Sequence, residues 1–182
     1  MNVLKTNIEG VLILEPTRYG DQRGYFMESF SARDFEQAVG YSVNFVQDNE
    51  SLSAKGVLRG LHFQREPYAQ AKLVRVVRGR VLDVAVDIRK GSPTYGGYVA
   101  VELSGENGRQ LFIPKGFAHG FLALEEGTVF QYKCDEYYHP ESEDGIAWND
   151  PEVAIDWGVG EEEVVLSEKD RNRLKLKEVC EF

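Results

Sequence analysis

Histidines are the first residues to consider for chemistry, because the imidazole ring takes up and releases protons near neutral pH. The chain has three, which are His62, His119 and His139. His62 lies near the end of the apolar run 57–64, and His119 completes a Pro-x-Gly-x-x-His pattern that starts at residue 114. His139 precedes a proline in a loop-like stretch. His62 and His119 are therefore the two histidines with an informative setting.

The Pro-x-Gly-x-x-His pattern resembles the second motif of the cupin superfamily, a group of small double-sheet barrels. Metal-binding cupins resemble one another in a His-x-His pair with a later glutamate, whereas here Gln64 stands two residues after His62. The next lysine, Lys72, would bring positive charge toward the same pocket. Protein metal sites need three or four nitrogen, sulfur or carboxylate ligands. The sequence therefore predicts a site with no metal, and it disfavours a metal-dependent dioxygenase.

A histidine, a lysine and a tyrosine without a metal suit proton transfer at a carbon next to a ketone. Such a reaction needs a base for the α-proton, a cation or donor for the enolate oxygen, and an acid on the opposite face. Histidine has an unperturbed pKa of about 6.5 and is available as the base, and Lys72 can hold the enolate oxygen. Strand alternation over residues 128–134 places Phe130, Tyr132 and Cys134 on one face. If that face is the interior, the Tyr132 phenol points into the pocket.

The elements that must position these side chains are short strands. Apolar runs rich in β-branched and aromatic residues recur between turn residues, a spacing that predicts a sandwich or a closed barrel. The expected strands are Val11–Glu15, Tyr25–Phe30, Val43–Val46, Val57–Phe63, Leu73–Val77, Val81–Ile88, Tyr98–Leu103, Leu111–Ile113, Phe121–Leu124 and Val129–Cys134. We expect a mainly β fold: one cupin-type, double-stranded jelly roll over residues 1–182 with a few short peripheral helices.

Local signals predict three further features. Ser31 suits the N-cap of a helix that Gly40 closes, and the charge-rich tail 161–177 suits one or two short surface helices. The sequence Val-Arg-Gly-Arg-Val at 77–81 is typical of a tight hairpin turn.

Composition limits the classes of binding partner and the cellular compartment that we expect for this protein. Of the 182 residues, 42% are hydrophobic, which is enough for a packed core. The formal net charge of −9 argues against nucleic acid, whose phosphates require a basic surface, although a few local cations still suit one anionic small molecule. Two cysteines without metal-like spacing, Cys134 and Cys180, are typical of a reducing compartment. The longest apolar run near the N-terminus, Val11–Leu14, is too short for a signal peptide or a membrane span. We therefore expect a cytoplasmic protein with no membrane partner.

Longer motifs occur in order along most of the chain. They are Asp21-x-Arg-Gly-x-Phe, Phe45-Val-Gln-Asp-Asn49, Val57-Leu-Arg-Gly-Leu-His-Phe-Gln64, Lys72-Leu-Val-Arg75, Asp83-Val-Ala-Val-Asp-Ile-Arg89, Ile113-Pro-x-Gly-Phe-Ala-His-Gly-Phe121, Tyr137-Tyr138 and Trp148-Asn-Asp150. Together they resemble the dTDP-4-dehydrorhamnose 3,5-epimerase family. The resemblance implies a homodimeric, cofactor-independent isomerase of dTDP-rhamnose biosynthesis. Such an enzyme inverts C3 and C5 of dTDP-4-dehydro-6-deoxy-D-glucose to give dTDP-4-dehydro-L-rhamnose.

The resemblance also implies roles for individual residues. His62 would accept the proton, Tyr132 would donate one, and Lys72 would face the C4 oxygen of the sugar. Asp170 would complete the catalytic set by pairing with His62 and raising its basicity. Tyr138 would stack on the thymine ring. The remaining residues that would bind the nucleotide diphosphate and the sugar are Arg23, Phe26, Glu28, Gln47, Asn49, Arg59, His119, Glu143 and Lys169.

Simpler interpretations of the same residues remain. Alone, His62 suits a buried core histidine, Tyr132 a core aromatic residue, and Lys72 an ordinary surface lysine. Asp170 lies in a polar tail, where a carboxylate can simply be solvated. The sequence departs from the family at Cys134-Asp-Glu136, directly after the expected donor, and in the tail 171–182, which leaves the orientation of the sugar near C3 and C5 open.

Other functions fit the same scaffold. A related epimerase that inverts one carbon, or a ketoisomerase, would share the base and differ in where the acid lies. A non-catalytic cupin that binds nucleotide sugars would have lost the base or the donor, and neither is lost here. Solvent deuterium incorporation at C3 and C5 distinguishes these alternatives.

Strand geometry raises one conflict in these assignments. In a regular strand Arg59 and His62 point to opposite faces, yet the resemblance places both on the same ligand. Gly60 lies between them, and glycine within a strand often marks a bulge. We therefore predict an irregularity at Gly60, or an Arg59 that serves the site of a second subunit. The alternating segment Val11–Phe30 is expected to pair across the dimer interface and cover an exposed edge.

Overall fold

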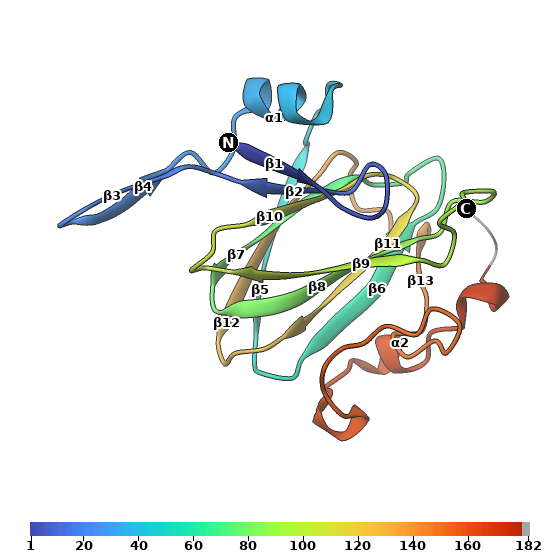
Figure 1. Ribbon diagram of the computed structural model, residues 1–182. Helices are drawn as coiled ribbons and strands as arrows, with labels where there is room; N and C mark the ends of the chain where they lie inside the picture. Colours follow the sequence, from blue (N-terminus) through green and yellow to red (C-terminus); the bar gives the residue numbers. More distant parts are fainter. Residues whose placement is uncertain (180–182) are drawn as a thin grey trace.

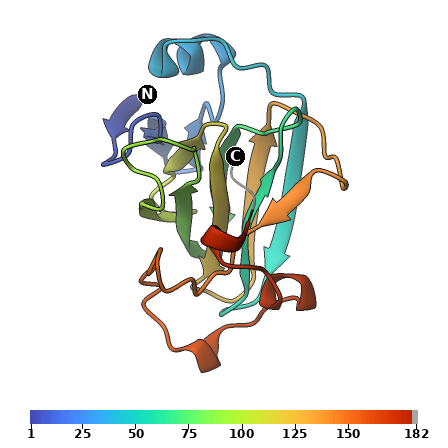
Figure 2. The same cartoon turned by 90° about the vertical axis from the view of Figure 1, so that its right-hand side faces the viewer.

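Two antiparallel β-sheets face each other and form the body of the computed structural model (Figure 1), which describes residues 1–179. Cys180 lies outside the described residues. Helix α1 lies at one end of the molecule, and the segment that carries the short helices η1 and α2 lies at the other end (Figures 1 and 2). This arrangement confirms the mainly β jelly roll with short peripheral helices.

The first sheet has six strands and the second has five. In spatial order, the six-stranded sheet consists of β1 (Asn2–Lys5), β2 (Leu12–Glu15), β10 (Gln110–Ile113), β7 (Lys72–Arg78), β12 (Thr128–Cys134) and β5 (Gln47–Ser53). The five-stranded sheet consists of β13 (Glu143–Gly145), β6 (Leu58–Gln64), β11 (Phe117–Ala123), β8 (Arg80–Asp87) and β9 (Tyr98–Ser104). The helical elements are α1 (Ala32–Val39), η1 (Glu161–Glu163), α2 (Glu168–Arg171) and η2 (Leu176–Glu178).

Side-chain alternation along the strands builds the core between the sheets. In β9, Val99, Val101 and Leu103 are buried while Ala100 and Glu102 are exposed, as expected for a strand with one face on a core. The facing sheet contributes its own inward residues, among them Val74, Val76, Leu111, Ile113 and Phe130. Burial of these apolar surfaces is the main favourable term in folding, and it fixes which side chains of each strand face the interior.

Two further apolar clusters cover the outer faces. Residues 146–179 pack over the five-stranded sheet, where Trp148, Trp157 and Leu176 belong to one buried cluster with Leu58 and Val86 of that sheet. At the other sheet, Phe35 of α1 lies edge-on to Phe112 of β10, with ring centroids 5.1 Å apart. The C-terminal segment is therefore anchored to the sheet that contains β6.

Helix α1 forms as its caps predict. The Ser31 hydroxyl accepts a hydrogen bond from the Asp34 backbone N–H, and Gly40 ends the helix in the left-handed conformation. Glycine adopts that conformation without the steric cost of a Cβ atom. In the tail, the structure has two short 3₁₀ helices and α2, but Asp170 and Leu176 within it are buried. The expectation that the tail lies on the surface is therefore correct only in part.

Two local expectations were wrong. The turn at 77–81 joins β7 to β8, but these strands belong to different sheets, so the turn crosses the sandwich and forms no hairpin. Residues 43–46 form no strand. The strand begins at Gln47 instead, because pairing with β12 rather than local hydrophobicity defines β5.

A two-stranded hairpin, β3 (Arg18–Asp21) with β4 (Gly24–Met27), projects from the body of the molecule (Figure 1). Its aromatic side chains are largely exposed, with 66% of Tyr19 and 69% of Phe26 accessible. The alternating segment 11–30 is thus divided between β2 and the hairpin. β2 lies between β1 and β10 and has no free edge, so within this segment the hairpin is the part that is available to a second copy of the chain.

Candidate active site

A cavity of about 570 Å³ opens between the two sheets and contains most of the expected site residues. Its wall includes the expected chemical residues His62, Lys72, Tyr132 and Asp170, and also Gln47, Asn49, Arg59, His119, Tyr138, Glu143 and Lys169. Arg23, Phe26 and Glu28 do not line it. The first two belong to the projecting hairpin, and Glu28 follows directly after β4.

An irregularity at Gly60 allows both Arg59 and His62 to reach this cavity. On β11, His119 pairs with His62 and Phe121 pairs with Arg59, so β6 contains one residue more than β11 over this stretch. Gly60 adopts a φ of 132°, and a Cβ atom there would lie 2.5 Å from the Gly120 Cα atom. The irregularity predicted at Gly60 is confirmed, and it resolves the conflict between Arg59 and His62.

His62 is paired with a buried carboxylate. Its Nε2 atom lies 2.5 Å from Asp170 Oδ1, and Asp170 is only 5% exposed. Asp170 belongs to α2, whose N-cap Ser167 accepts a hydrogen bond from the Asp170 N–H. The Asp170 carboxylate is therefore not simply solvated, although the surrounding sequence is polar. A second contact between a histidine and a carboxylate involves His119, which also lines the cavity.

Charge and hydrogen bonding keep Asp170 ionised. Burial alone would raise the pKa of Asp170, but the hydrogen bond and charge of His62 and the hydrogen bond of Ser167 hold that pKa below its ordinary value. The anionic carboxylate orients the imidazole and leaves the second ring nitrogen for proton transfer.

Lys72 and Tyr132 come from the opposite sheet. Tyr132 lies on β12 and Lys72 begins β7, with the Lys72 Nζ atom 6.0 Å from the centre of the Tyr132 ring. Burial raises the pKa of Tyr132, so the phenol keeps its proton and can donate it. Burial lowers the pKa of Lys72, against the opposing effect of nearby negative groups. Lys72 is thus part of the cavity wall and not an ordinary surface lysine.

Cys134 shares the inner face of β12 with Phe130 and Tyr132, as the alternation predicts. It is 1% exposed, and burial raises the pKa of its thiol to about 11. The thiol is therefore neutral and contributes a small apolar surface beside Lys72.

The second histidine–carboxylate pair joins His119 to the buried Asp83. The sequence reasoning did not assign a role to Asp83. The His119 Nε2 atom lies 2.9 Å and 3.1 Å from the two Asp83 oxygens, and Asp83 is fully buried. The signal was present in the sequence, because a single acidic residue interrupts the apolar run 81–86. Buried charges require a partner, so Asp83 should have been paired with a basic group.

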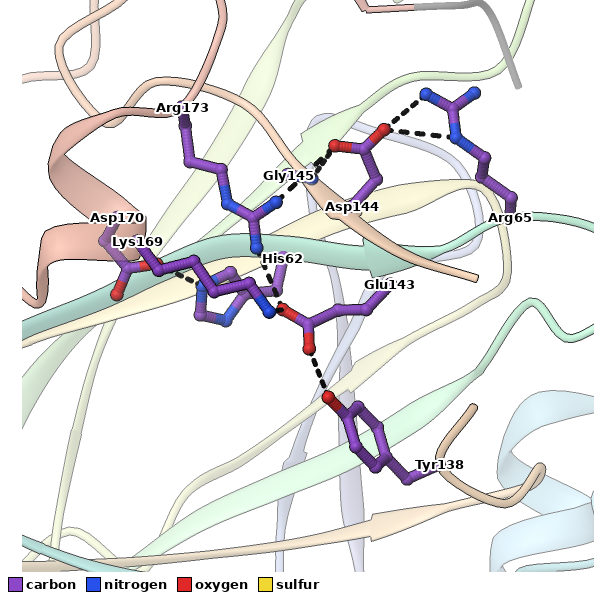
Figure 3. Close-up of polar contacts among 9 residues, drawn as sticks. All are labelled: His62, Arg65, Tyr138, Glu143, Asp144, Gly145, Lys169, Asp170 and Arg173. Atoms are coloured by element: carbon purple, nitrogen blue, oxygen red, sulfur yellow. Dashed lines mark hydrogen bonds and ion pairs between the residues drawn. The ribbon is translucent and has the colours of Figure 1, made fainter. Parts of the chain in front are cut away.

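A network of charged side chains forms one rim of the cavity (Figure 3). Glu143 accepts a hydrogen bond from the Tyr138 hydroxyl at 2.5 Å and pairs with Lys169 at 2.6 Å and with Arg173 at 2.8 Å. The pKa of Glu143 is below its ordinary value, because these partners outweigh the opposing effect of burial. Sequence reasoning missed Arg173, which lies in the tail that matches the family poorly.

Further polar groups line the cavity. Arg59 donates to the Ser53 hydroxyl at 3.2 Å and to the Leu52 carbonyl at 3.3 Å. The Gln47 side chain donates to Asn49 at 3.0 Å and accepts from the Tyr138 backbone N–H at 3.1 Å. Arg59 and Lys169 thus provide cationic groups at the mouth of the cavity, a setting that suits an anionic ligand.

Within residues 1–179, no group of three or more histidine, cysteine, aspartate or glutamate side chains is arranged to hold a metal ion. The described part of the chain also has no helix that is long and apolar enough to cross a membrane.

Comparison with known proteins identifies relatives along nearly the whole chain. Residues 5–178 match the family model described as dTDP-4-dehydrorhamnose 3,5-epimerase. The chain is 58% identical to the dTDP-4-dehydrorhamnose 3,5-epimerase of Escherichia coli, over 98% of this chain and 96% of that protein. It is 56% identical to the enzyme of the same name from Methanothermobacter thermautotrophicus, over 96% of this chain and 94% of that protein.

The fold also matches a solved structure over nearly its whole length. The crystal structure of a dTDP-6-deoxy-D-glucose-3,5-epimerase from Legionella pneumophila, in complex with dTDP-4-keto-L-rhamnose, superimposes with a TM-score of 0.93 at 56% identity. The match covers 97% of this chain and 93% of that chain.

Proposed function

The chain belongs to the dTDP-4-dehydrorhamnose 3,5-epimerase family. We propose that its cavity binds a dTDP-linked 4-keto sugar, and that the configuration of the sugar carbons is inverted there with His62 as base and Tyr132 as acid. The enzyme is an isomerase that converts dTDP-4-dehydro-6-deoxy-D-glucose to dTDP-4-dehydro-L-rhamnose in dTDP-rhamnose biosynthesis. It does so by removing protons from the carbons next to the C4 ketone. The assignment of individual side chains to these steps is the proposal.

One observation carries the proposal: His62 and Tyr132 lie on facing sheets of the same cavity. Inversion requires that a proton leave one face of the sugar and that another proton arrive on the other face. A base on β6 and an acid on β12 meet this requirement for a ring held between the sheets.

The steps balance without a redox change. His62 takes the proton from C5 or C3, and the electron pair moves into the ketone to form an enolate. Lys72 stabilises the developing charge on the C4 oxygen, since a cation placed where charge appears lowers the barrier. Tyr132 then returns a proton to the carbon from the opposite face. Solvent restores the protonation states of His62 and Tyr132, so each inverted carbon acquires a solvent hydrogen.

The remaining wall residues suit the nucleotide. Arg59 and His119 supply positive or hydrogen-bonding groups for the diphosphate, with Gln47 and Asn49 beside them. Tyr138 presents an exposed ring that suits stacking on thymine, and its hydroxyl is held by Glu143, which is itself paired with Lys169.

A homodimer accounts for the three expected residues that lie outside the cavity. Arg23, Phe26 and Glu28 are exposed on or beside the projecting hairpin. An exposed aromatic surface of this kind is typical of an interaction site. We propose that this hairpin reaches the cavity of a second copy, where it brings Arg23 to the diphosphate and Phe26 to the base.

Mixing two inactive variants tests the shared site. Arg23→Ala and His62→Ala each impair both sites of their own homodimer, whereas a mixed dimer has one site with a native hairpin and a native base. Recovery of activity after the two proteins are unfolded together and refolded supports hairpin exchange. A mixture that stays as inactive as its parents, although sedimentation shows dimers, contradicts it.

Product analysis tests the function itself. The purified protein, incubated with dTDP-4-dehydro-6-deoxy-D-glucose and a coupled 4-keto reductase, should give dTDP-L-rhamnose. A product inverted at one carbon only would identify a single-carbon epimerase, and an unchanged sugar with retained dTDP binding would identify a non-catalytic binding protein.

A further inference from the structure

The segment that carries Asp170 is attached by backbone hydrogen bonds to β6 at its start and to Ala147, just after β13, at its end. At its start, the Leu58 N–H donates to the Val165 carbonyl at 3.0 Å and the Val165 N–H donates to Gly56 at 2.8 Å. At its end, the Ala147 N–H donates to the Leu174 carbonyl at 2.8 Å. Helix α2 lies between these attachments and has only four residues, so its internal hydrogen bonds contribute little rigidity. The position of Asp170 therefore depends on the side chains that hold this segment.

Two side chains, Lys169 within α2 and Arg173 just after it, tie this segment to the sheet edge, and Arg173 is the more buried of the two. Its Nη2 atom lies 2.8 Å from Glu143 Oε1 and its Nη1 atom lies 3.5 Å from Asp144 Oδ1, both on β13 (Figure 3). The Arg173 side chain is 11% exposed. Asp144 is held from its other oxygen by Arg65. A largely buried guanidinium that engages two carboxylates defines geometry better than an exposed ion pair does.

The Arg173 guanidinium also lies against the strand residue that faces His62. Gly145 pairs with His62 across β13 and β6. A Cβ atom at Gly145 would lie 3.0 Å from Arg173 Nε and 3.2 Å from Arg173 Cζ, so glycine leaves room for the guanidinium. One short segment thus places Asp170 against the His62 ring and Arg173 against Gly145, the strand partner of His62.

We propose that Arg173 is a positioning residue for the epimerisation, because by joining Glu143 and Asp144 it holds α2 where Asp170 meets His62. The inference rests on the proposed function, in which His62 is the base. Arg173 is not part of the described cavity wall, and it acts on the reaction through Asp170. Small misplacements of a catalytic group lower rates up to about 100-fold, so Arg173→Ala should lower kcat by about 10- to 100-fold.

A double-mutant cycle tests whether Arg173 acts through Asp170. The rate of epimerisation is measured for the native enzyme, Arg173→Ala, Asp170→Asn and the double variant. If Arg173 serves to place the carboxylate, its removal should cost less than about threefold once Asp170 is already replaced, because residues that act as one unit are not additive. A loss of equal size in both backgrounds overturns the proposal, since a general loss of structure would add.

Two further variants complete the experiment. Arg171→Ala is the matched control, because Arg171 is an exposed arginine of the same segment, and it should retain kcat within about twofold. Arg173→Lys keeps one charge but not the fork that reaches two carboxylates, and it should give an intermediate kcat. If Arg173→Ala does not fold, the cycle is completed with Arg173→Lys, and additivity there overturns the proposal in the same way. A native enzyme that exchanges no substrate protons would instead contradict the proposed function.

Discussion

His62 has the partner and the location that a general base requires. It lies on the cavity wall, and a buried, ionised Asp170 orients its ring. General-base help contributes roughly 10²- to 10⁴-fold to a rate. We therefore expect His62→Ala to lose activity by about that factor while its circular dichroism spectrum stays native. His139→Ala is the control, because His139 stacks on Tyr68 away from the cavity wall. Native proton exchange in His62→Ala would show that His62 is structural.

Tyr132 should separate proton removal from inversion. Tyr132→Phe keeps the buried ring but removes the acid, so the variant should still exchange substrate protons with solvent while it forms little inverted product. Tyr137→Phe is the control, because Tyr137 is 59% exposed and lies outside the cavity wall. If Tyr132→Phe forms product at the native rate, another group is the acid.

The ionisation of Tyr132 predicts the direction in which the activity changes with pH. Burial raises the pKa of Tyr132 above 10.0, the ordinary value for tyrosine, so the folded protein favours the protonated phenol. Activity that depends on this proton should persist up to that value and fall as the pH rises through the raised pKa. The comparison of ultraviolet titrations of the native protein and Tyr132→Phe measures this ionisation directly. A phenol that ionises below pH 10.0 contradicts the assignment.

Single residues also show the limit of inference from sequence. The roles expected of His62, Lys72 and Tyr132 followed from residue type and motif, and all three residues line one cavity. Asp83 and Arg173 were missed, because each acquires its partner through long-range folding. Asp83 is 36 positions from His119, and Arg173 is 30 positions from Glu143. The apolar run around Asp83 indicated that this carboxylate is buried, but no local pattern identifies the partner of either residue.

At the scale of elements, the irregularity in β6 is the feature that aligns the site. Gly60→Ala adds a Cβ atom 2.5 Å from the Gly120 backbone at a φ of 132°, so β6 and β11 must separate. We expect the free energy of unfolding to fall by about 2 kcal/mol or more, with a loss of activity. Gly24→Ala is the control, because Gly24 has a φ of 124° with nothing within 4 Å of its added Cβ atom. Equal destabilisation of the two variants would show that the close contact with β11 is unimportant.

The loop after β8 depends on one buried carboxylate. Asp87 is fully buried and accepts hydrogen bonds from Arg89, Ser92 and Thr94. Burial would raise the pKa of Asp87, but these bonds hold that pKa well below its ordinary value. Its stabilising contribution is therefore complete above pH 3.8, the ordinary pKa of an aspartate, and is lost as the pH falls further.

Asp87→Ala should lower the free energy of unfolding by about 3 kcal/mol near pH 7, because it leaves Arg89 and two hydroxyls without their partner. Urea unfolding of Asp87→Ala and of Glu152→Gln makes the comparison. Glu152 forms an exposed pair with Lys177, so its substitution should change stability by less than about 0.5 kcal/mol. Similar small effects for both variants would show that the Asp87 network is not important for stability.

Strands were predictable where one face of the strand is strongly apolar, as in β8 and β9. β5 was missed because its sequence, Gln47–Ser53, is polar, and it forms by pairing with β12. The crossing between β7 and β8 was mistaken for a hairpin turn, because a short Gly-containing turn looks alike in both settings. Tertiary pairing, and not local propensity, decides these cases.

At the scale of the whole molecule, the sandwich brings together residues from distant parts of the chain. β6 supplies His62, β12 supplies Tyr132, β7 supplies Lys72 and the C-terminal segment supplies Asp170. The protein has a formal net charge of −9, yet Arg59, Lys72 and Lys169 converge on one cavity. Glu50, Glu143 and Asp170 line the same wall, so three basic side chains face three carboxylates there. This local balance of charge suits a nucleoside diphosphate sugar better than the acidic surface does, and it could not be read from overall composition.

The central claim is that two carbons of one sugar each lose a proton and gain one from solvent on the opposite face. The most direct measurement is the incubation of dTDP-4-dehydro-6-deoxy-D-glucose with the enzyme in D₂O, followed by NMR of the sugar. The proposed mechanism predicts deuterium at both C3 and C5, and it predicts that His62→Ala slows incorporation at both positions together. Deuterium at only one of these carbons, or at neither, would contradict it.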